Sequence, residues 1–126
     1  MSKLHVAESE TEPEVVFDFA ENTFALRGMS YMEDVMGFYE PLLEKLEAHV
    51  SSLSDATINF DFALSYFNSS SSRIVFQIFT LLDAAAEAGN QVTITWHHSG
   101  DDDMLEQGEE FAEDLETATF VMADSD

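Results

Sequence analysis

The sequence predicts an α/β domain in which a mixed sheet carries helices packed mainly on one face. Strand-like and helix-like stretches alternate along most of the chain, which requires parallel strands joined by right-handed crossovers. Two predicted strands, 56–64 and 91–98, alternate between apolar and polar residues, so one face of the sheet meets water. The length of 126 residues fits one hydrophobic core.

The N-terminal third is predicted to contain a leader and a hairpin. Residues 1–14 are acidic and are expected to form a flexible leader with a short strand at Leu4–Val6, ahead of a single domain over 15–126. The runs VVFDFA and TFALRG, separated by Glu21 and Asn22, indicate a tight antiparallel hairpin.

A first helix is predicted to follow this hairpin. Ser30 stands three residues before Glu33, a capping-box pattern, and apolar residues at helical spacing continue to about Ser51. Pro41 lies inside this pattern, so a kink or a restart of the helix is expected there.

Two further helices and a last strand complete the prediction. Apolar residues in step over 70–88 predict a second helix that ends at Gly89. Asp103, with Glu106 three residues later, predicts a third helix over 104–115, and TATFVMA predicts the last strand. A mixed sheet with one open face and helices on the other is the architecture of STAS-like, or anti-anti-sigma-like, domains.

The charge excludes several kinds of partner. Asp and Glu number 26 against 4 Lys and Arg, a formal net charge of -22, so nucleic acid and anionic membranes would be repelled. The acidity fits either a solvated surface, as in a saline habitat, or attraction to a basic partner. With no cysteine, no signal-peptide pattern and no membrane span, a cytoplasmic location is expected.

Four consecutive serines stand at the predicted start of the second helix, in SYFNSSSSRIVF. Asn68, Ser69 or Ser70 can cap the free backbone N–H groups of the first helical turn. A phosphate there would also meet free N–H groups and the positive end of the helix dipole. Arg73 follows about one turn later and could contact such a phosphate. Both a plain cap and a modified hydroxyl fit these residues.

The motif YFNSSSSR, together with SYMEDVMGFYEPLLEKLE, GNQVTITWHH and DDDMLEQGEEFAEDL, resembles the SiaC family of regulatory phosphoproteins. The similarity extends from about Gly28 to Met122. It implies a STAS-like fold and a hydroxyl that a Ser/Thr protein kinase phosphorylates and a PP2C-type phosphatase clears. It also implies that the unphosphorylated form activates a diguanylate cyclase, which raises cyclic di-GMP and favours biofilm growth.

Carried onto this chain, the resemblance makes Ser69, directly after Asn68, the expected phosphorylation site, with Ser70 and Ser71 as alternatives. The residues expected to contact the phosphate or the partner are Tyr66, Asn68, Ser70, Arg73 and Phe76. A hypothesis of another class is a non-switching STAS-like module that binds a small anion or lipid at the same helix tip. The oligomeric state stays open.

Neither an enzyme, a metal nor a cofactor is expected. His97 and His98 lie near three aspartates, but adjacent strand residues point to opposite faces, and the aspartates do not match a calcium loop. The motifs G-x-S-x-G, S-x-x-K and the phosphate-binding glycine loops do not occur. Phe76 and Phe79 widen the apolar stripe of the second helix, which fits either burial or an exposed edge for a protein partner.

Overall fold

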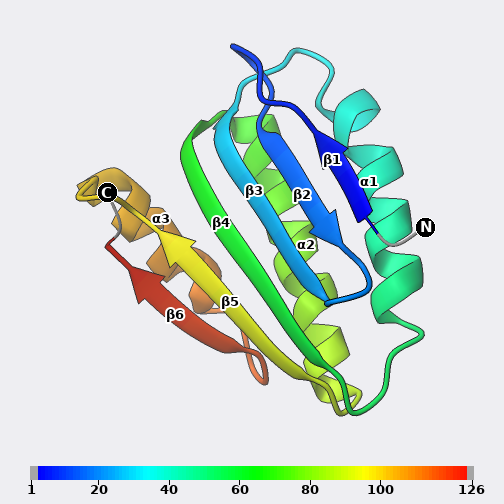
Figure 1. Ribbon diagram of the computed structural model, residues 1–126. Helices are drawn as coiled ribbons and strands as arrows, with labels where there is room; N and C mark the ends of the chain where they lie inside the picture. Colours follow the sequence, from blue (N-terminus) through cyan, green and yellow to red (C-terminus); the bar gives the residue numbers. More distant parts are fainter. Residues whose placement is uncertain (1–2, 125–126) are drawn as a thin grey trace.

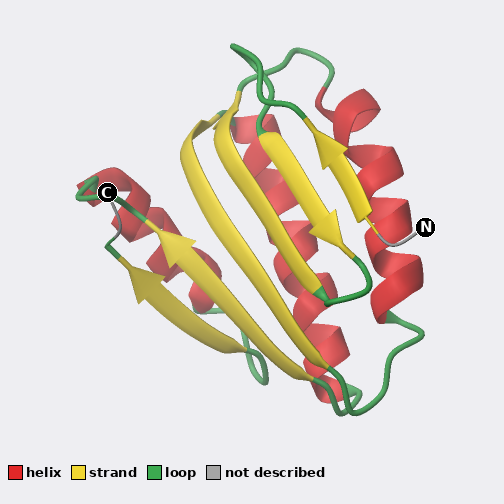
Figure 2. Cartoon of the chain, in the orientation of Figure 1, coloured by secondary structure: helices red, strands yellow, loops and turns green. Residues whose placement is uncertain are grey.

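The computed structural model describes residues 3–124 and shows a six-stranded sheet with three helices on one face (Figures 1 and 2). Residues 1–2 of the predicted leader and 125–126 of the predicted domain lie outside the described residues. The elements are β1 (Lys3–Val6), β2 (Glu14–Asp18), β3 (Thr23–Ser30), α1 (Val35–Val50), β4 (Thr57–Phe67), α2 (Ser69–Glu87), β5 (Gln91–His97), α3 (Asp102–Ala112) and β6 (Thr119–Ala123). The predicted fold class is confirmed.

The strands lie in the sheet in the order of the chain, from β1 to β6. The first three pair antiparallel, and β3, β4, β5 and β6 pair parallel, as the helix between each of the last strands requires. The predicted hairpin of β2 and β3 is confirmed, and Asn22 in its turn has a positive φ of 56°. Asparagine tolerates this left-handed conformation better than most residues do.

The core fills the space between the sheet and its helices. Alternate residues of β4 and β5 point into it, as the alternating sequence pattern predicts. The largest fully buried side chains are Trp96, Tyr39, Phe17, Phe60, Phe62 and Phe79. On the other face, polar side chains meet across the strands, and His97 lies 3.7 Å from Asp61. The open face that the sequence predicts is therefore confirmed.

The predicted start of the first helix is wrong. Ser30 does not cap α1: it is the last residue of β3, pairs with Phe67 of β4 and is fully buried. Asp34 caps the helix instead, because its Oδ1 accepts a hydrogen bond of 3.0 Å from the Gly37 N–H. The helix also runs without interruption through Pro41, so no restart occurs there. Strand pairing and burial outweigh the local capping pattern.

The predicted cap of the third helix is wrong by two residues. Asp101 is the N-cap of α3 and accepts hydrogen bonds from the N–H groups of Asp103 and Met104. The helix ends at Ala112, before the predicted end at 115, because the segment that follows is held elsewhere: Asp83 of α2 binds the backbone of residues 116–118.

The parallel strand β4 runs three residues beyond its predicted end. The register with β3 shifts between Gly28, which pairs with Leu64, and Met29, which pairs with Tyr66, so Ser65 is an extra residue in β4. This bulge interrupts the alternation, and Ser65 and Tyr66 are both exposed before Phe67 turns into the core. The bulge therefore places Tyr66 on the surface, next to the start of α2.

Candidate functional site

Asn68 caps the start of α2, as the interpretation of the serine run as a plain helix cap predicts. Asn68 has extended backbone angles, and its Oδ1 accepts a 2.9 Å hydrogen bond from the Ser71 N–H. Ser72 N–H donates to the carbonyl oxygen of Asn68 at 3.0 Å. The serine run therefore occupies the first turn of a well-formed helix.

The four serine hydroxyls of this turn have different surroundings. Ser69 and Ser70 are exposed. Ser71 is fully buried, and its hydroxyl donates to the carbonyl oxygen of Ser30 at 3.2 Å. Ser72 is half-buried and donates to the carbonyl oxygen of Ser69 at 2.7 Å. Ser69 and Ser70 are therefore the most exposed residues of the run.

A hollow lies between the first turns of α1 and α2. Its lining includes Glu33, Asp34, Met36, Ser70, Arg73 and Gln77. Arg73 is exposed and, within residues 3–124, forms no ion pair. Spaced four residues after Ser69 and three after Ser70, it lies on their side of the helix. The guanidinium therefore has no ion-pair partner within these residues, but it shares the hollow with the carboxylates of Glu33 and Asp34.

A chain of buried hydroxyls lies beneath the serine run. Ser30 Oγ donates to Ser71 Oγ at 2.8 Å and lies 2.6 Å from the Tyr39 hydroxyl of α1. Since Ser30 donates its proton to Ser71, Tyr39 donates to Ser30. Burial raises the pKa of Tyr39 to about 12, although the hydrogen bond with Ser30 acts in the opposite direction. Tyr39 therefore stays protonated and links α1 to the first turn of α2.

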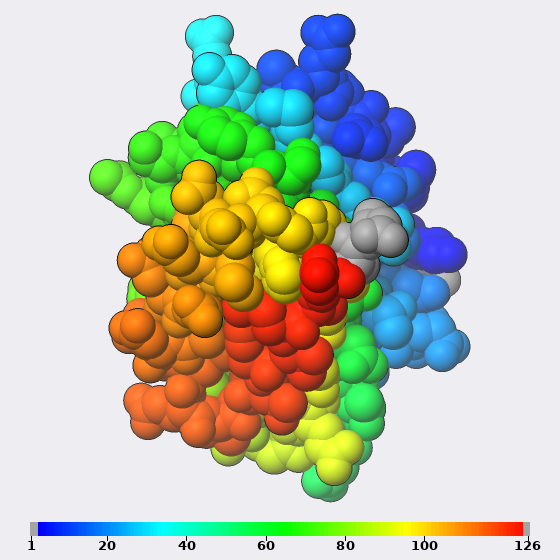
Figure 3. All heavy atoms as spheres, turned by 90° about the vertical axis from the view of Figure 1, so that its left-hand side faces the viewer, coloured from blue at the N-terminus to red at the C-terminus, as the bar shows by residue number. Residues whose placement is uncertain are grey.

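Exposed apolar side chains gather around the same end of the molecule. The large apolar side chains that are exposed within residues 3–124 are Met29, Tyr31, Met36, Tyr66, Phe76 and Val121. We call the first five the exposed patch, because they lie around the start of α2, whereas Val121 lies on β6. Tyr31 is 52% and Tyr66 45% exposed, and their rings pack edge to face with centroids 5.4 Å apart. In Figure 3 the cyan and green surfaces around the end of β3 and the start of α2 adjoin at the upper end of the molecule.

The structure separates the two phenylalanines that the sequence analysis treats together. Phe79 is buried in the core, whereas Phe76 is 43% exposed. Phe76 follows Ser69 by seven residues, two helical turns, and so lies on the same side of α2. Tyr66, Asn68, Ser70 and Arg73 all lie at the α2 start, so the structure brings the predicted contact residues together.

Met29, Tyr31 and Met36 are exposed beside the serine run although no local sequence pattern predicts it. Met29 and Tyr31 flank Ser30 at the end of β3, where the incorrect capping interpretation assigned a helix start. Parallel pairing of Ser30 with Phe67 is the feature that brings this segment beside the serine run. The only sequence signal was the predicted parallel order of the strands.

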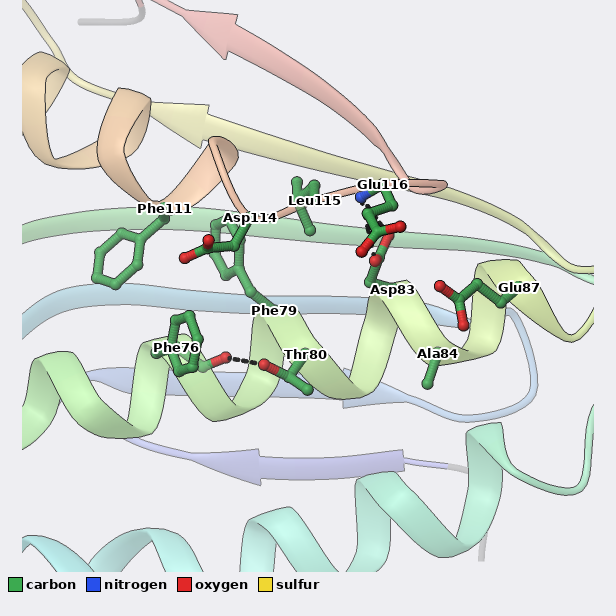
Figure 4. Close-up of a pocket in the computed structure, with 10 residues that line it drawn as sticks. All are labelled: Phe76, Phe79, Thr80, Asp83, Ala84, Glu87, Phe111, Asp114, Leu115 and Glu116. Carbon is green, nitrogen blue, oxygen red and sulfur yellow. Dashed lines mark hydrogen bonds between the residues drawn. The ribbon is translucent and has the colours of Figure 1, made fainter.

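A separate cavity of about 330 Å³ lies between α2 and α3 (Figure 4). Its lining includes Phe76, Phe79, Asp83, Phe111, Asp114 and Glu116. In Figure 4, Asp83 points from α2 toward the backbone of Glu116 rather than into open space. Apart from Phe76, the cavity does not involve the predicted site residues, so it is distinct from the candidate site.

Asp83 fixes the connection between α3 and β6. Its Oδ1 accepts hydrogen bonds from the N–H groups of Thr117 and Ala118 at 2.9 and 2.8 Å, and its Oδ2 accepts one from Glu116 at 3.1 Å. Burial raises the pKa of Asp83, but these three backbone hydrogen bonds outweigh it and hold the pKa below its ordinary value.

We expect Asp83→Asn to lower the free energy of unfolding by about 1–3 kcal/mol at neutral pH, since the amide loses the charge that these N–H groups bind. The folded-state pKa is lowered, so this contribution is present above the unfolded pKa and is lost as pH falls through the folded pKa. Urea unfolding at several pH values measures it. Glu87→Gln, an exposed site one turn later, is the matched control. A difference between wild type and Asp83→Asn that stays constant down to pH 2 would contradict this account.

The fold and the site together define a small STAS-like α/β domain whose candidate functional region is an exposed surface at one helix start. Within residues 3–124, no group of three or more acidic, histidine or cysteine side chains could hold a metal ion, and no helix is long and apolar enough to cross a membrane. The chain belongs to the SiaC family: the family model described as "SiaC family regulatory phosphoprotein" matches residues 6–125. The resemblance found in the sequence is confirmed.

Proteins of Pseudomonas aeruginosa are similar over almost the whole chain. The uncharacterised protein PA14_02130 of strain UCBPP-PA14 is 27% identical over 115 residues, which cover 90% of each protein. The crystal structure of apo-SiaC superposes with a TM-score of 0.88 at 26% identity and covers 98% of this chain and 99% of that one. A chain in the crystal structure of the diguanylate cyclase SiaD with its activator SiaC matches with a TM-score of 0.88 at 25% identity, covering 95% and 98%.

Proposed function

We propose that this chain is a non-enzymatic regulatory phosphoprotein that binds and controls a diguanylate cyclase, and that phosphorylation of Ser69 switches this binding off. The observation that carries the proposal is an exposed serine in the first turn of α2, surrounded by exposed apolar side chains. Membership of the SiaC family and the complex of the P. aeruginosa cyclase SiaD with its activator SiaC support the choice of partner.

Surroundings favour Ser69 over the other serines as the phosphate acceptor. A kinase needs an exposed hydroxyl, and Ser71 is fully buried while Ser72 donates to the backbone. Ser70 is exposed, but it lines the hollow together with Glu33 and Asp34, which would repel a phosphate there. Ser69 does not line that hollow.

A phosphate on Ser69 would be stable on this chain and unfavourable in a complex. The N–H groups of the first α2 turn, the helix dipole and Arg73 stabilise a doubly charged group at this end. A partner that covers the exposed patch would have to remove water from the same group, which is costly among Tyr66, Phe76 and other apolar side chains. The unmodified chain is therefore the form that binds.

The proposed setting is cytoplasmic cyclic di-GMP signalling, with biofilm growth or aggregation as the output. A Ser/Thr protein kinase would add the phosphate, and a PP2C-type phosphatase would remove it. A non-switching module for a small anion or lipid is the weaker hypothesis, because Glu33 and Asp34 share the hollow with Arg73. Two carboxylates beside one guanidinium make a poor site for a free anion.

Co-expression with Ser/Thr protein kinases, chosen first from any encoded near its gene, tests this assignment. We expect one phosphate, located on Ser69 by fragment mass spectrometry, and its loss on treatment with a PP2C-type phosphatase. Ser69→Ala should abolish the modification, and Ser72→Ala, in the same turn, should leave it unchanged. A chain that stays unmodified, or one phosphorylated only outside the serine run, would overturn the switch.

A further inference from the structure

Four hydrogen bonds join the N-cap and first turn of α2 to the end of β3 and the residues that follow it. The backbone N–H of Asn68 donates to the Ser30 carbonyl at 3.1 Å, and its Nδ2 donates to the Met32 carbonyl at 3.5 Å. Ser71 Oγ donates to the Ser30 carbonyl at 3.2 Å and accepts from Ser30 Oγ at 2.8 Å. We call these contacts of Ser30, Met32, Asn68 and Ser71 the clasp.

Tyr31 lies between the two residues that the clasp holds. Its own N–H donates to the carbonyl oxygen of Thr11 at 2.8 Å, while its ring stays exposed and packs against Tyr66. Both neighbours of Tyr31 in the chain are fixed through Asn68 and Ser71. The clasp therefore sets the position of the most exposed aromatic side chain of the patch.

A phosphate on Ser69 would act on one end of the clasp. Asn68 Oδ1 accepts from the Ser71 N–H, which is one of the first-turn amides that a phosphate also attracts. Phosphate oxygens are stronger acceptors than a side-chain amide oxygen, because they carry charge. When the phosphate takes this N–H, the Asn68 side chain loses its main acceptor contact, and its weaker Nδ2 contact with Met32 is no longer oriented.

We propose that Ser71 and Asn68 are positioning residues of the switch: through the clasp they hold Tyr31 in place on the exposed patch, and they pass the state of Ser69 to it. The biological meaning of this coupling rests on the proposed function, but the coupling is a property of the chain alone. The buried link from Ser71 through Ser30 to Tyr39 extends it to α1.

The chain has three tyrosines, Tyr31, Tyr39 and Tyr66, so fluorotyrosine labelling gives three ¹⁹F NMR signals, which single Tyr→Phe variants assign. Phosphoserine is placed at position 69 during translation, so neither kinase nor cyclase is needed. We expect the signals of Tyr31 and of buried Tyr39 to move by more than their line widths. A Tyr31 signal that stays in place would overturn the proposal, and an unmoved Tyr39 signal alone would limit the coupling to the clasp.

Variants of the clasp test whether the effect of a phosphate on Ser69 reaches Tyr31 through these hydrogen bonds. In Ser71→Ala the Tyr31 signal should already be displaced, and phosphoserine at 69 should move it little further. Ser72→Ala, whose hydroxyl contacts only its own turn, should respond as the wild type does. A Ser71→Ala chain that responds as the wild type does would overturn the clasp.

Asn68→Asp provides a second variant should Ser71→Ala fail to fold. Aspartate keeps the helix cap but has no N–H for Met32, so the Tyr31 signal should move in the unphosphorylated chain. An unmoved signal would count against the clasp. Loss of cyclase binding alone would leave these NMR results intact, so the two proposals can fail separately.

Discussion

Ser69→Asp is expected to weaken the binding of the diguanylate cyclase by at least about tenfold, or about 1.4 kcal/mol, while Ser69→Ala binds as the unmodified chain does. The carboxylate must lose water when the partner covers the exposed patch, whereas a methyl group need not. A negative charge is favourable in the first turn of a helix, so Ser69→Asp should fold normally. Titration calorimetry of the cyclase with both variants measures the difference.

Ser52→Asp is the matched control for this experiment. Ser52 is exposed and follows the C-cap of α1, and it receives the same added charge. The C-terminal end of α1 and the start of α2 lie at opposite ends of the helix layer (Figure 1). Ser52→Asp should bind with wild-type affinity, which separates a local effect from the added charge on a chain already at -22. Equal affinities of Ser69→Ala and Ser69→Asp would contradict the switch.

Tyr66→Ala is expected to reduce cyclase affinity roughly thirtyfold, about 2 kcal/mol, because tyrosine is enriched among the hot-spot residues that dominate binding at interfaces. Tyr66 is 45% exposed and its ring contacts Tyr31, so stability should change by only about 0.5 kcal/mol. Binding and urea unfolding, measured on the same preparation, separate the two effects.

Val121→Ala is the control for Tyr66→Ala. Val121 is 42% exposed, an exposed fraction similar to the 45% of Tyr66. It lies on the edge strand β6, outside the exposed patch. Its truncation should leave cyclase affinity unchanged. A similar loss from both variants, or none from Tyr66→Ala, would place the docking surface elsewhere.

The double variant Tyr31→Ala, Tyr66→Ala should lose less binding free energy than the sum of the losses of the two single variants, since the two rings contact each other.

Local patterns predict most of this fold, because they act within a few residues. Strict alternation in 56–64 and 91–98 predicts buried and exposed faces that the structure confirms. The three candidate caps Asn68, Ser69 and Ser70 stand before a strong helical pattern, and the structure selects Asn68. Element order then predicts the parallel strands, and the alternation within them predicts the open sheet face.

Contacts between distant segments could not be predicted in this way. Ser30 fits a capping box in the sequence, but its partners, Phe67 and Ser71, lie about 40 residues away and hold it at the end of β3. The extra residue Ser65, which exposes Tyr66, becomes visible only when β4 is paired with β3. The exposed patch depends on both features, so the sequence predicts only the serine run and its nearest neighbours as the site.

The most direct test of the central claim is a titration of the cyclase with the chain carrying phosphoserine at position 69, against the unmodified chain and a chain with phosphoserine at position 52. We predict that the unmodified chain and the position-52 control bind and raise cyclic di-GMP synthesis equally. Phosphoserine at 69 should abolish both effects, and removal of the phosphate should restore them. Equal binding and equal stimulation by all three chains would contradict the account.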